Sequence, residues 1–107
     1  MIESNPSTSF EAMGTIDVVG DNVNISFWCF ELLVPDRRLR PSAEWVEEYF
    51  ESYTADALLR LLNLPPIANH VVKFTGCISG WYDYWGEYDE DVEIQKVEAR
   101  YAEVWEL

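Results

Sequence analysis

The chain has 107 residues and a mass of 12.5 kDa, the size of one ordinary domain, and it contains no internal repeat. Apolar residues make up 49 %, which is enough for a buried core and excludes a disordered acidic tail. Twenty Asp and Glu against seven Lys and Arg give a net charge of −13, so nucleic acid and anionic membrane are excluded as direct partners and a basic protein surface is favoured.

The N-terminal half begins with a segment, residues 1–8, that we expect to be flexible, followed by one domain over 9–107. Apolar residues at even spacing predict a strand from Phe10 to about Val19, and 20–22 then supplies turn residues for a hairpin. A second strand is expected over about 23–34. Its alternation predicts one face with Val23, Ile25, Phe27 and Cys29, and another with Trp28, Phe30 and Leu32.

A helical region follows a loop, 35–41, that carries three of the seven positive charges. Ser42 is a candidate N-cap, and Thr54 is a candidate cap for a second short helix. The sequence leaves open whether 42–63 forms one helix or two. An aromatic stripe at helical spacing is expected to face the core: Trp45, Tyr49 and Tyr53, with Val46 and Phe50.

The C-terminal part is expected to contain a strand over 71–78 and a second element from Val92 onward. The spacing of apolar residues there fits a helix, or a strand with one extra residue near Gln95. We favour the strand, because it would cover a sheet edge that is otherwise unpaired. The predicted fold is α+β in the order ββαββ, an antiparallel sheet with a helical layer on one face.

Catalytic and metal-binding motifs are weak in this sequence. His70 is the only histidine, and two cysteines with one histidine fall short of a structural zinc site. Asp89, Asp91 and Glu93 alternate, but the glycine and the bidentate glutamate of a calcium loop are missing. We therefore expect neither an enzyme nor a cofactor. Cys29 and Cys77 are expected to be reduced core residues, with a disulfide between neighbouring strands left open.

The segment from Gly80 to Asp91, GWYDYWGEYDED, has five aromatic residues, five acidic residues and no basic one. We expect some of its rings to pack on the helix and its acids to project as a tip. Such a mixture suits an interaction surface, because aromatic rings anchor a complex while charges mainly steer association. The alternative is a solvated acidic face that only aids solubility.

The tail, GCISGWYDYWGEYDEDVEIQKVEA, resembles the ends of small acidic bacteriophage-encoded proteins. The resemblance is one of size and texture, and it implies the anti-CRISPR or nucleic-acid-mimic type of inhibitor. No functional residue carries over from it. The basic loop at Arg37, Arg38 and Arg40 departs from a uniformly acidic mimic.

The predicted function is a binding protein that blocks a basic nucleic-acid-binding surface of a host defence protein by charge mimicry. The alternatives are an interaction module or homodimer joined through exposed aromatics or a sheet edge, and then a carbohydrate-binding domain. The first residues lack a signal peptide and no apolar run is long enough for a membrane span, so a cytoplasmic location in a bacterial host is expected. The candidate partner-binding residues are Asp83, Trp85, Glu87, Tyr88, Asp89, Glu90, Asp91, Glu93, Glu44, Glu47, Glu48 and Glu51.

Overall fold

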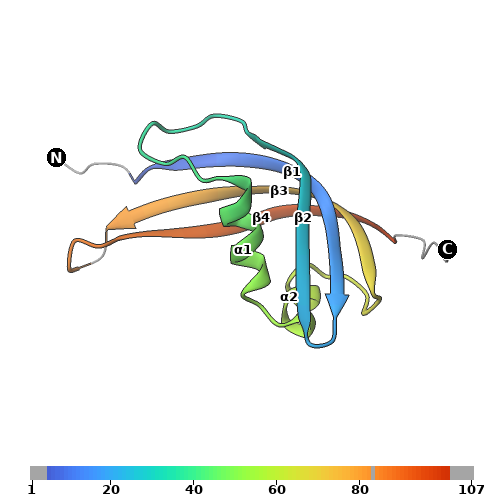
Figure 1. The fold of residues 1–107 in the computed structure, drawn as a ribbon. Helices are drawn as coiled ribbons and strands as arrows, with labels where there is room; N and C mark the ends of the chain where they lie inside the picture. Colours follow the sequence, from blue (N-terminus) through green and yellow to red (C-terminus); the bar gives the residue numbers. More distant parts are fainter. Residues whose placement is uncertain (1–4, 83, 102–107) are drawn as a thin grey trace.

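The computed structural model describes residues 5–82 and 84–101, which form one antiparallel sheet of four strands with two helices. Figure 1 shows both helices on the same side of the curved sheet. The fold is therefore α+β, with two strands, two helices and two strands in chain order. The elements are β1 (Ser7–Val19), β2 (Asn22–Leu32), α1 (Ala43–Glu51), α2 (Ala55–Leu61), β3 (Asn69–Tyr82) and β4 (Tyr88–Tyr101).

The strand order is β2-β1-β3-β4, so two hairpins lie side by side with β1 paired to β3. This order makes β2 and β4 the edges of the sheet. It also places β1 between the strands that carry the two cysteines. Cys29 and Cys77 are free, and the disulfide that the sequence left open is wrong because their strands are not neighbours. The expectation that both are core residues is also wrong, because Cys29 is exposed and Cys77 only half-buried.

The first hairpin has the predicted turn, with Gly20 at φ 62°, but β1 begins earlier than expected. Ser7 and Thr8, which the sequence placed in the N-terminal segment, belong to the strand, and Thr8 is buried. The reason is the neighbouring β3, which pairs with β1 as far as Ser7. The buried Thr8 hydroxyl is satisfied because it donates a hydrogen bond to the carbonyl oxygen of Ser9 at 3.3 Å.

The predicted common face of Val23, Ile25 and Phe27 is confirmed, but a bulge at Trp28 reverses the predicted faces of β2 after that residue. Met13 pairs with Cys29 and Gly14 pairs with Phe27, so Trp28 has no partner in β1. One extra residue reverses the alternation, and Phe30 therefore shares the core face with Phe27. Trp28 is 58 % exposed.

The helical region is two helices, because both predicted caps operate. The Ser42 side chain accepts a hydrogen bond from the backbone of Trp45, and Thr54 does the same for Ala57. Between α1 and α2, the backbone of Thr54 is extended, so the chain turns there. In α1 the fully buried positions are Val46 and Phe50, whereas Trp45, Tyr49 and Tyr53 of the predicted stripe are half-buried.

The core lies between the helices and the inward face of the sheet. The ring of Phe50 stacks on Phe74 of β3 at 5.3 Å between centroids, and Phe27 meets Phe74 edge to face. The fully buried side chains Phe10, Ile16 and others from β1 and β3 continue this layer. The contact between α1 and the sheet therefore rests on aromatic packing beneath its centre.

β4 is a strand as far as Tyr101, which confirms the favoured interpretation of this segment. Thr75 pairs with Lys96 and Gly76 with Ile94, so Gln95 is the extra residue of a bulge, as predicted. Residues 102–107 lie outside the described part of the chain. On the core side, Val92, Ile94 and Val97 are only partly buried, because the helices cover the other strands more fully.

Candidate functional site

The end of the β3–β4 hairpin projects beyond the helices, as Figure 1 shows. It carries a group of rings and acids, all exposed except the half-buried Glu90, that we call the hairpin tip: Tyr82, Tyr84, Trp85, Glu87, Tyr88, Asp89 and Glu90. Tyr84 is 93 % exposed, Trp85 83 % and Tyr82 70 %. Large rings with so little cover are typical of interaction surfaces. Of Trp81, Tyr82, Tyr84 and Trp85, some of which were expected to pack on the helix, the last three are exposed because the long strands carry them past it, and Trp81 is half-buried.

The rings of the hairpin tip are held in pairs across and along the hairpin. Tyr82 and Tyr88 are opposite each other in the two strands and meet at 5.2 Å and 64°. Tyr84 and Trp85 meet edge to face at 5.3 Å and 88°. Tyr88 also lies across Gly80, where a Cβ atom would collide with its hydroxyl. The rings therefore have preferred positions although solvent reaches them.

Negative charge surrounds these rings, and it acts on the groups that titrate there. Burial, and then the charge of Asp89, raise the pKa of the Glu90 carboxyl. Burial, and then the charge of Glu90, raise the pKa of the Tyr88 hydroxyl. Like charges therefore accumulate at the tip, and such an accumulation attracts a cationic partner.

The basic loop approaches this region, so the surface is not uniformly acidic. Arg38 forms an ion pair with Asp36 at 3.1 Å, and the Arg38 hydrogen bond holds the pKa of Asp36 below its usual value. Charges of both residues reach Tyr88 and act on its pKa in opposite directions. The loop is anchored by Leu39, which is 1 % exposed.

Asp91 has a structural contact that separates it from the rest of the predicted acidic tip. Its Oδ1 accepts hydrogen bonds from the Tyr49 hydroxyl at 3.0 Å and from the Val92 backbone at 3.0 Å. Burial, with the hydrogen bonds to Tyr53 and Asp91, raises the pKa of Tyr49. Asp91 thus ties β4 to α1 rather than projecting alone.

Glu47 and Glu51 of α1 bind the backbone of the edge strand β2. The Oε2 atom of Glu47 accepts from the N–H of Phe27 at 2.7 Å, and that of Glu51 accepts from Ile25 at 3.1 Å. One helical turn separates the two acids, and alternate strand residues lie a similar distance apart. Both carboxylates therefore satisfy N–H groups of a sheet edge, and their predicted role in partner binding is not supported by their position.

The remaining predicted residues are spread over separate surfaces. Glu44 and Glu48 are exposed on α1, and Glu93 is exposed on β4. Asp83 lies outside the described residues. The structure brings together Trp85, Glu87, Tyr88, Asp89 and Glu90, but it does not join them to the helix acids. The sequence reasoning omitted Tyr82 and Tyr84 from the site, and the length of the two strands was the signal that could have placed them there.

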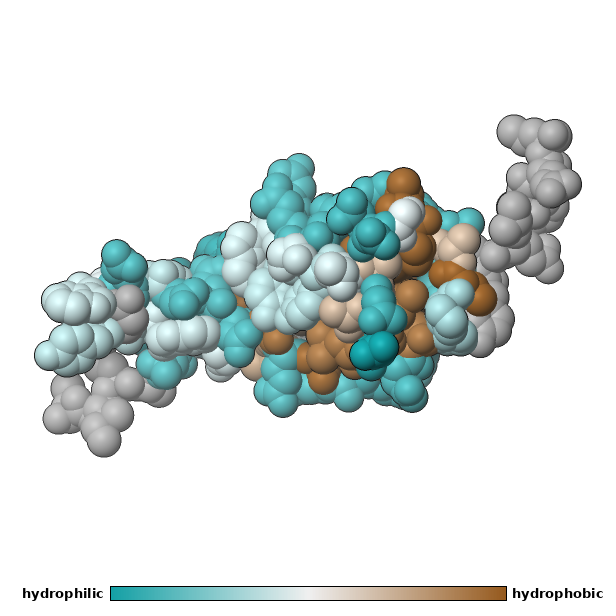
Figure 2. Space-filling model, turned by 90° about the horizontal axis from the view of Figure 1, so that it is seen from below, coloured by the Kyte–Doolittle hydropathy of each residue, from teal (hydrophilic) through white to brown (hydrophobic). Residues whose placement is uncertain are grey.

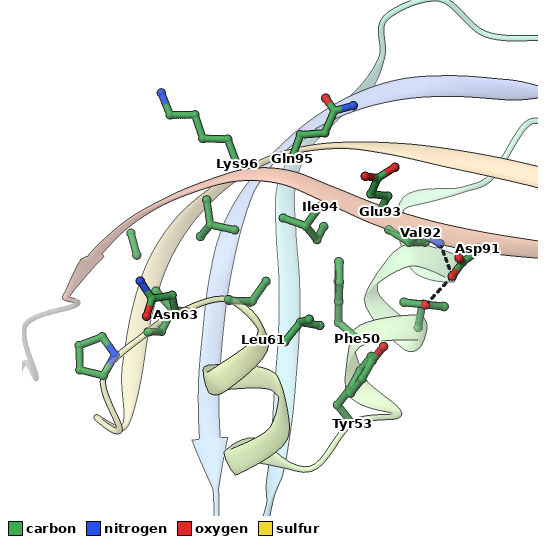
Figure 3. Close-up of a pocket in the computed structure, with 16 residues that line it drawn as sticks. Phe50, Tyr53, Leu61, Asn63, Asp91, Val92, Glu93, Ile94, Gln95 and Lys96 are labelled. Carbon is green, nitrogen blue, oxygen red and sulfur yellow. Dashed lines mark hydrogen bonds between the residues drawn. The ribbon is translucent and has the colours of Figure 1, made fainter.

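A groove of about 870 Å³ runs between the helices and the core side of β4. We call it the β4 groove. Figure 3 shows Ile94 pointing into it toward Phe50 and Leu61, while Glu93 and Lys96 point away from the helices. Leu61 is 55 % exposed there. Figure 2 shows hydrophobic side chains gathered on this helix side of the body.

Over residues 5–82 and 84–101, no cluster of His, Cys, Asp or Glu has the arrangement of a metal site. In the same part of the chain, neither helix has the length and hydropathy needed to span a bilayer. Comparison with protein-family models, curated proteins and solved structures gives no match to this chain.

Proposed function

We propose that this protein is an inhibitor that binds, through the hairpin tip, a basic surface on which a host protein holds nucleic acid. The observation that carries the proposal is the exposure of Tyr84 and Trp85 at the end of a projecting hairpin, in a segment from Gly80 to Asp91 that has five acidic residues and no basic one. Burial of the rings lengthens the lifetime of the complex, and the carboxylates favour a cationic surface as the partner.

The shape of the hairpin supports insertion into a concave surface. Its two strands extend past the helices, so the tip can enter a groove that the body of the protein does not fit (Figure 1). A groove that binds nucleic acid is lined by Lys and Arg that contact phosphates. The acids of the tip would occupy those cations, and the partner would then be blocked by competition. The resemblance to small acidic phage proteins agrees with a bacterial defence protein as the partner.

Carbohydrate binding is the weaker alternative for the same surface. Rings that bind a sugar chain usually present their faces as a platform for stacking. Here the rings of Tyr84 and Trp85 are perpendicular, and those of Tyr82 and Tyr88 are steeply inclined. The geometry therefore favours rings that fill pockets in a protein surface.

The experiment starts with capture of a partner from bacterial lysate and continues with association kinetics. The tip variant is Glu87→Gln, Asp89→Asn and Glu90→Gln; Asp91 is left intact because it binds Tyr49. The matched control removes three exposed acids elsewhere: Glu31→Gln, Glu44→Gln and Glu48→Gln. We expect the tip variant to associate at least about tenfold more slowly at low salt and to lose most of its salt dependence.

The control variant has the same net charge as the tip variant. It should keep most of the wild-type association rate, because the acids that it removes lie outside the hairpin tip. Nucleic acid should also compete with the wild-type protein for the partner. Equal slowing of both variants would show that net charge alone drives binding, and failure of nucleic acid to compete would overturn the mimic mechanism. Binding to a glycan array without affinity for basic proteins would favour the carbohydrate alternative.

A further inference from the structure

Within residues 5–82 and 84–101, β4 presents a long edge that no other strand covers. It is the last strand in the order β2-β1-β3-β4, and it runs for 14 residues. On the opposite edge, Glu47 and Glu51 of α1 accept hydrogen bonds from backbone N–H groups of β2. An uncovered edge pairs readily with another strand.

The bulge at Gln95 places charges of opposite sign on one face of this edge. Before the bulge, Asp89, Asp91 and Glu93 lie opposite outward residues of β3. Without an extra residue, Lys96 would point to the core side. The bulge reverses the alternation, and Figure 3 shows Lys96 pointing away from the helices as Glu93 does. Glu98 and Arg100 continue on that outward face.

The edge therefore has an acidic first half and a second half that holds both of its cations. When two copies of such a strand run antiparallel, the acidic half of each lies beside the cationic half of the other. Glu93 would be opposite Lys96 of the second copy, and Asp89 opposite Arg100. In this register the two members of each opposed pair on either side of the bulges point to the same face of the sheet, because both strands carry the same bulge.

We propose that β4 is a self-association edge, which pairs antiparallel with β4 of a second copy and joins the two sheets into one. On the groove side, the same register places Val92 opposite Val97 of the second copy. Apolar side chains of the second copy would then line the outer side of the β4 groove. A strand that fits this edge must be apolar on the groove side and complementary in charge on the other. β4 itself meets both conditions.

One opposed pair, Asp91 and Glu98, has like charges, and each member already has a partner within its own chain. Asp91 accepts a hydrogen bond from Tyr49, and Glu98 forms an ion pair with Lys96 at 2.6 Å. The proposal needs no basic partner and does not rest on the proposed function. Its test uses the purified chain alone, so the two can fail independently.

The experiment measures the mass of the protein in solution by sedimentation equilibrium over a range of concentrations. The variants are Glu93→Lys, Lys96→Glu and the double exchange of the two, all at exposed positions. Each single variant places like charges opposite each other twice, because the pairing is two-fold. We expect it to weaken dimerisation by about tenfold or more. The double exchange restores complementarity and leaves the net charge unchanged.

The proposal is supported if the wild type approaches twice 12.5 kDa, the single variants remain monomers and the double exchange recovers the dimer. Circular dichroism melting of all four proteins verifies that they are folded. A wild type that stays monomeric at the highest concentration overturns the proposal. A dimer that survives all three variants equally also overturns it, because it must use another surface.

Discussion

Glu47 and Glu51 belong to the acidic excess of the chain, yet their carboxylates are committed to the backbone of β2. From the sequence they are indistinguishable from Glu44 and Glu48, which share the same helix. The difference depends on which strand lies at the sheet edge beside α1, and strand order is not encoded in any local pattern. The sequence therefore predicts that the helix surface is acidic, but it does not predict which of these acids bind the backbone and which are exposed to solvent.

Replacing Glu47 by Ala should lower the free energy of unfolding by about 1–3 kcal/mol, because the Phe27 N–H loses a charged acceptor. Glu48→Ala, at an exposed position of the same helix, should change it by less than about 0.5 kcal/mol. Urea denaturation of both variants measures the difference. Equal effects would show that the bond to the sheet edge contributes nothing to stability.

His70 is fully buried, and its Nε2 lies 3.1 Å from the carbonyl oxygen of Pro65. Burial holds the pKa of His70 below its usual value of 6.5. The unfolded chain therefore takes up a proton first as the pH falls. The stability contributed by neutral His70 is complete above about pH 6.5 and decreases from there toward the folded-state pKa.

The His70→Gln variant keeps an amide that can reach Pro65 but removes this titration. Unfolding free energies of both proteins should be measured between about pH 5 and pH 8, a range that brackets the ordinary histidine pKa of about 6.5. The wild type should lose stability relative to the variant below about pH 6.5. Parallel curves would show that His70 does not change protonation on unfolding.

At the scale of elements, the two bulges show what the sequence could predict. Gln95 interrupts an otherwise regular alternation of apolar residues in β4, so its bulge could be anticipated. Trp28 lies within a continuous apolar run, Phe27 to Phe30, where either face assignment fits the pattern. Only pairing with Met13 and Gly14 of β1 decides it. The caps at Ser42 and Thr54 were recognisable because capping is local.

The docking of α1 on the sheet depends on Phe50 more than on Trp45, although both belong to the predicted stripe. Phe50 is 1 % exposed and stacks on Phe74, whereas Trp45 is half-buried. Phe50→Ala should therefore lower the unfolding free energy by about 3–5 kcal/mol, and Trp45→Ala by clearly less. Chemical denaturation tests the order. A larger loss of unfolding free energy for Trp45→Ala would mean that α1 packs on the sheet mainly through Trp45.

At the scale of the whole molecule, the negative charge destabilises the fold, and the extended shape of the hairpin reduces that effect. The net charge of −13 repels the chain from itself, and the structure moves part of that charge to the end of an extended hairpin. Composition gave the charge and the need for a cationic partner. It could not give the distance between the tip and the helix acids, because β2 and β4 are opposite edges of the sheet.

Salt should consequently have opposite effects on folding and on binding. Raising the ionic strength from about 0.01 M to about 0.1 M shortens the Debye length from about 30 Å to about 10 Å, which screens repulsion within the chain. If screening recovers about 1 kcal/mol, the melting temperature should rise by about 4–8 °C. Over the same range, association with a basic partner should slow.

The tip variant, Glu87→Gln, Asp89→Asn and Glu90→Gln, joins these two effects in one molecule. With three fewer like charges it should melt at the same temperature as the wild type or higher at low salt, and gain less from added salt. Its association should be slow already at low salt. Thermal melts and association rates at matched ionic strengths measure both. A variant that loses thermal stability at low salt would show that these carboxylates stabilise the hairpin, and their placement at a binding surface would then be wrong.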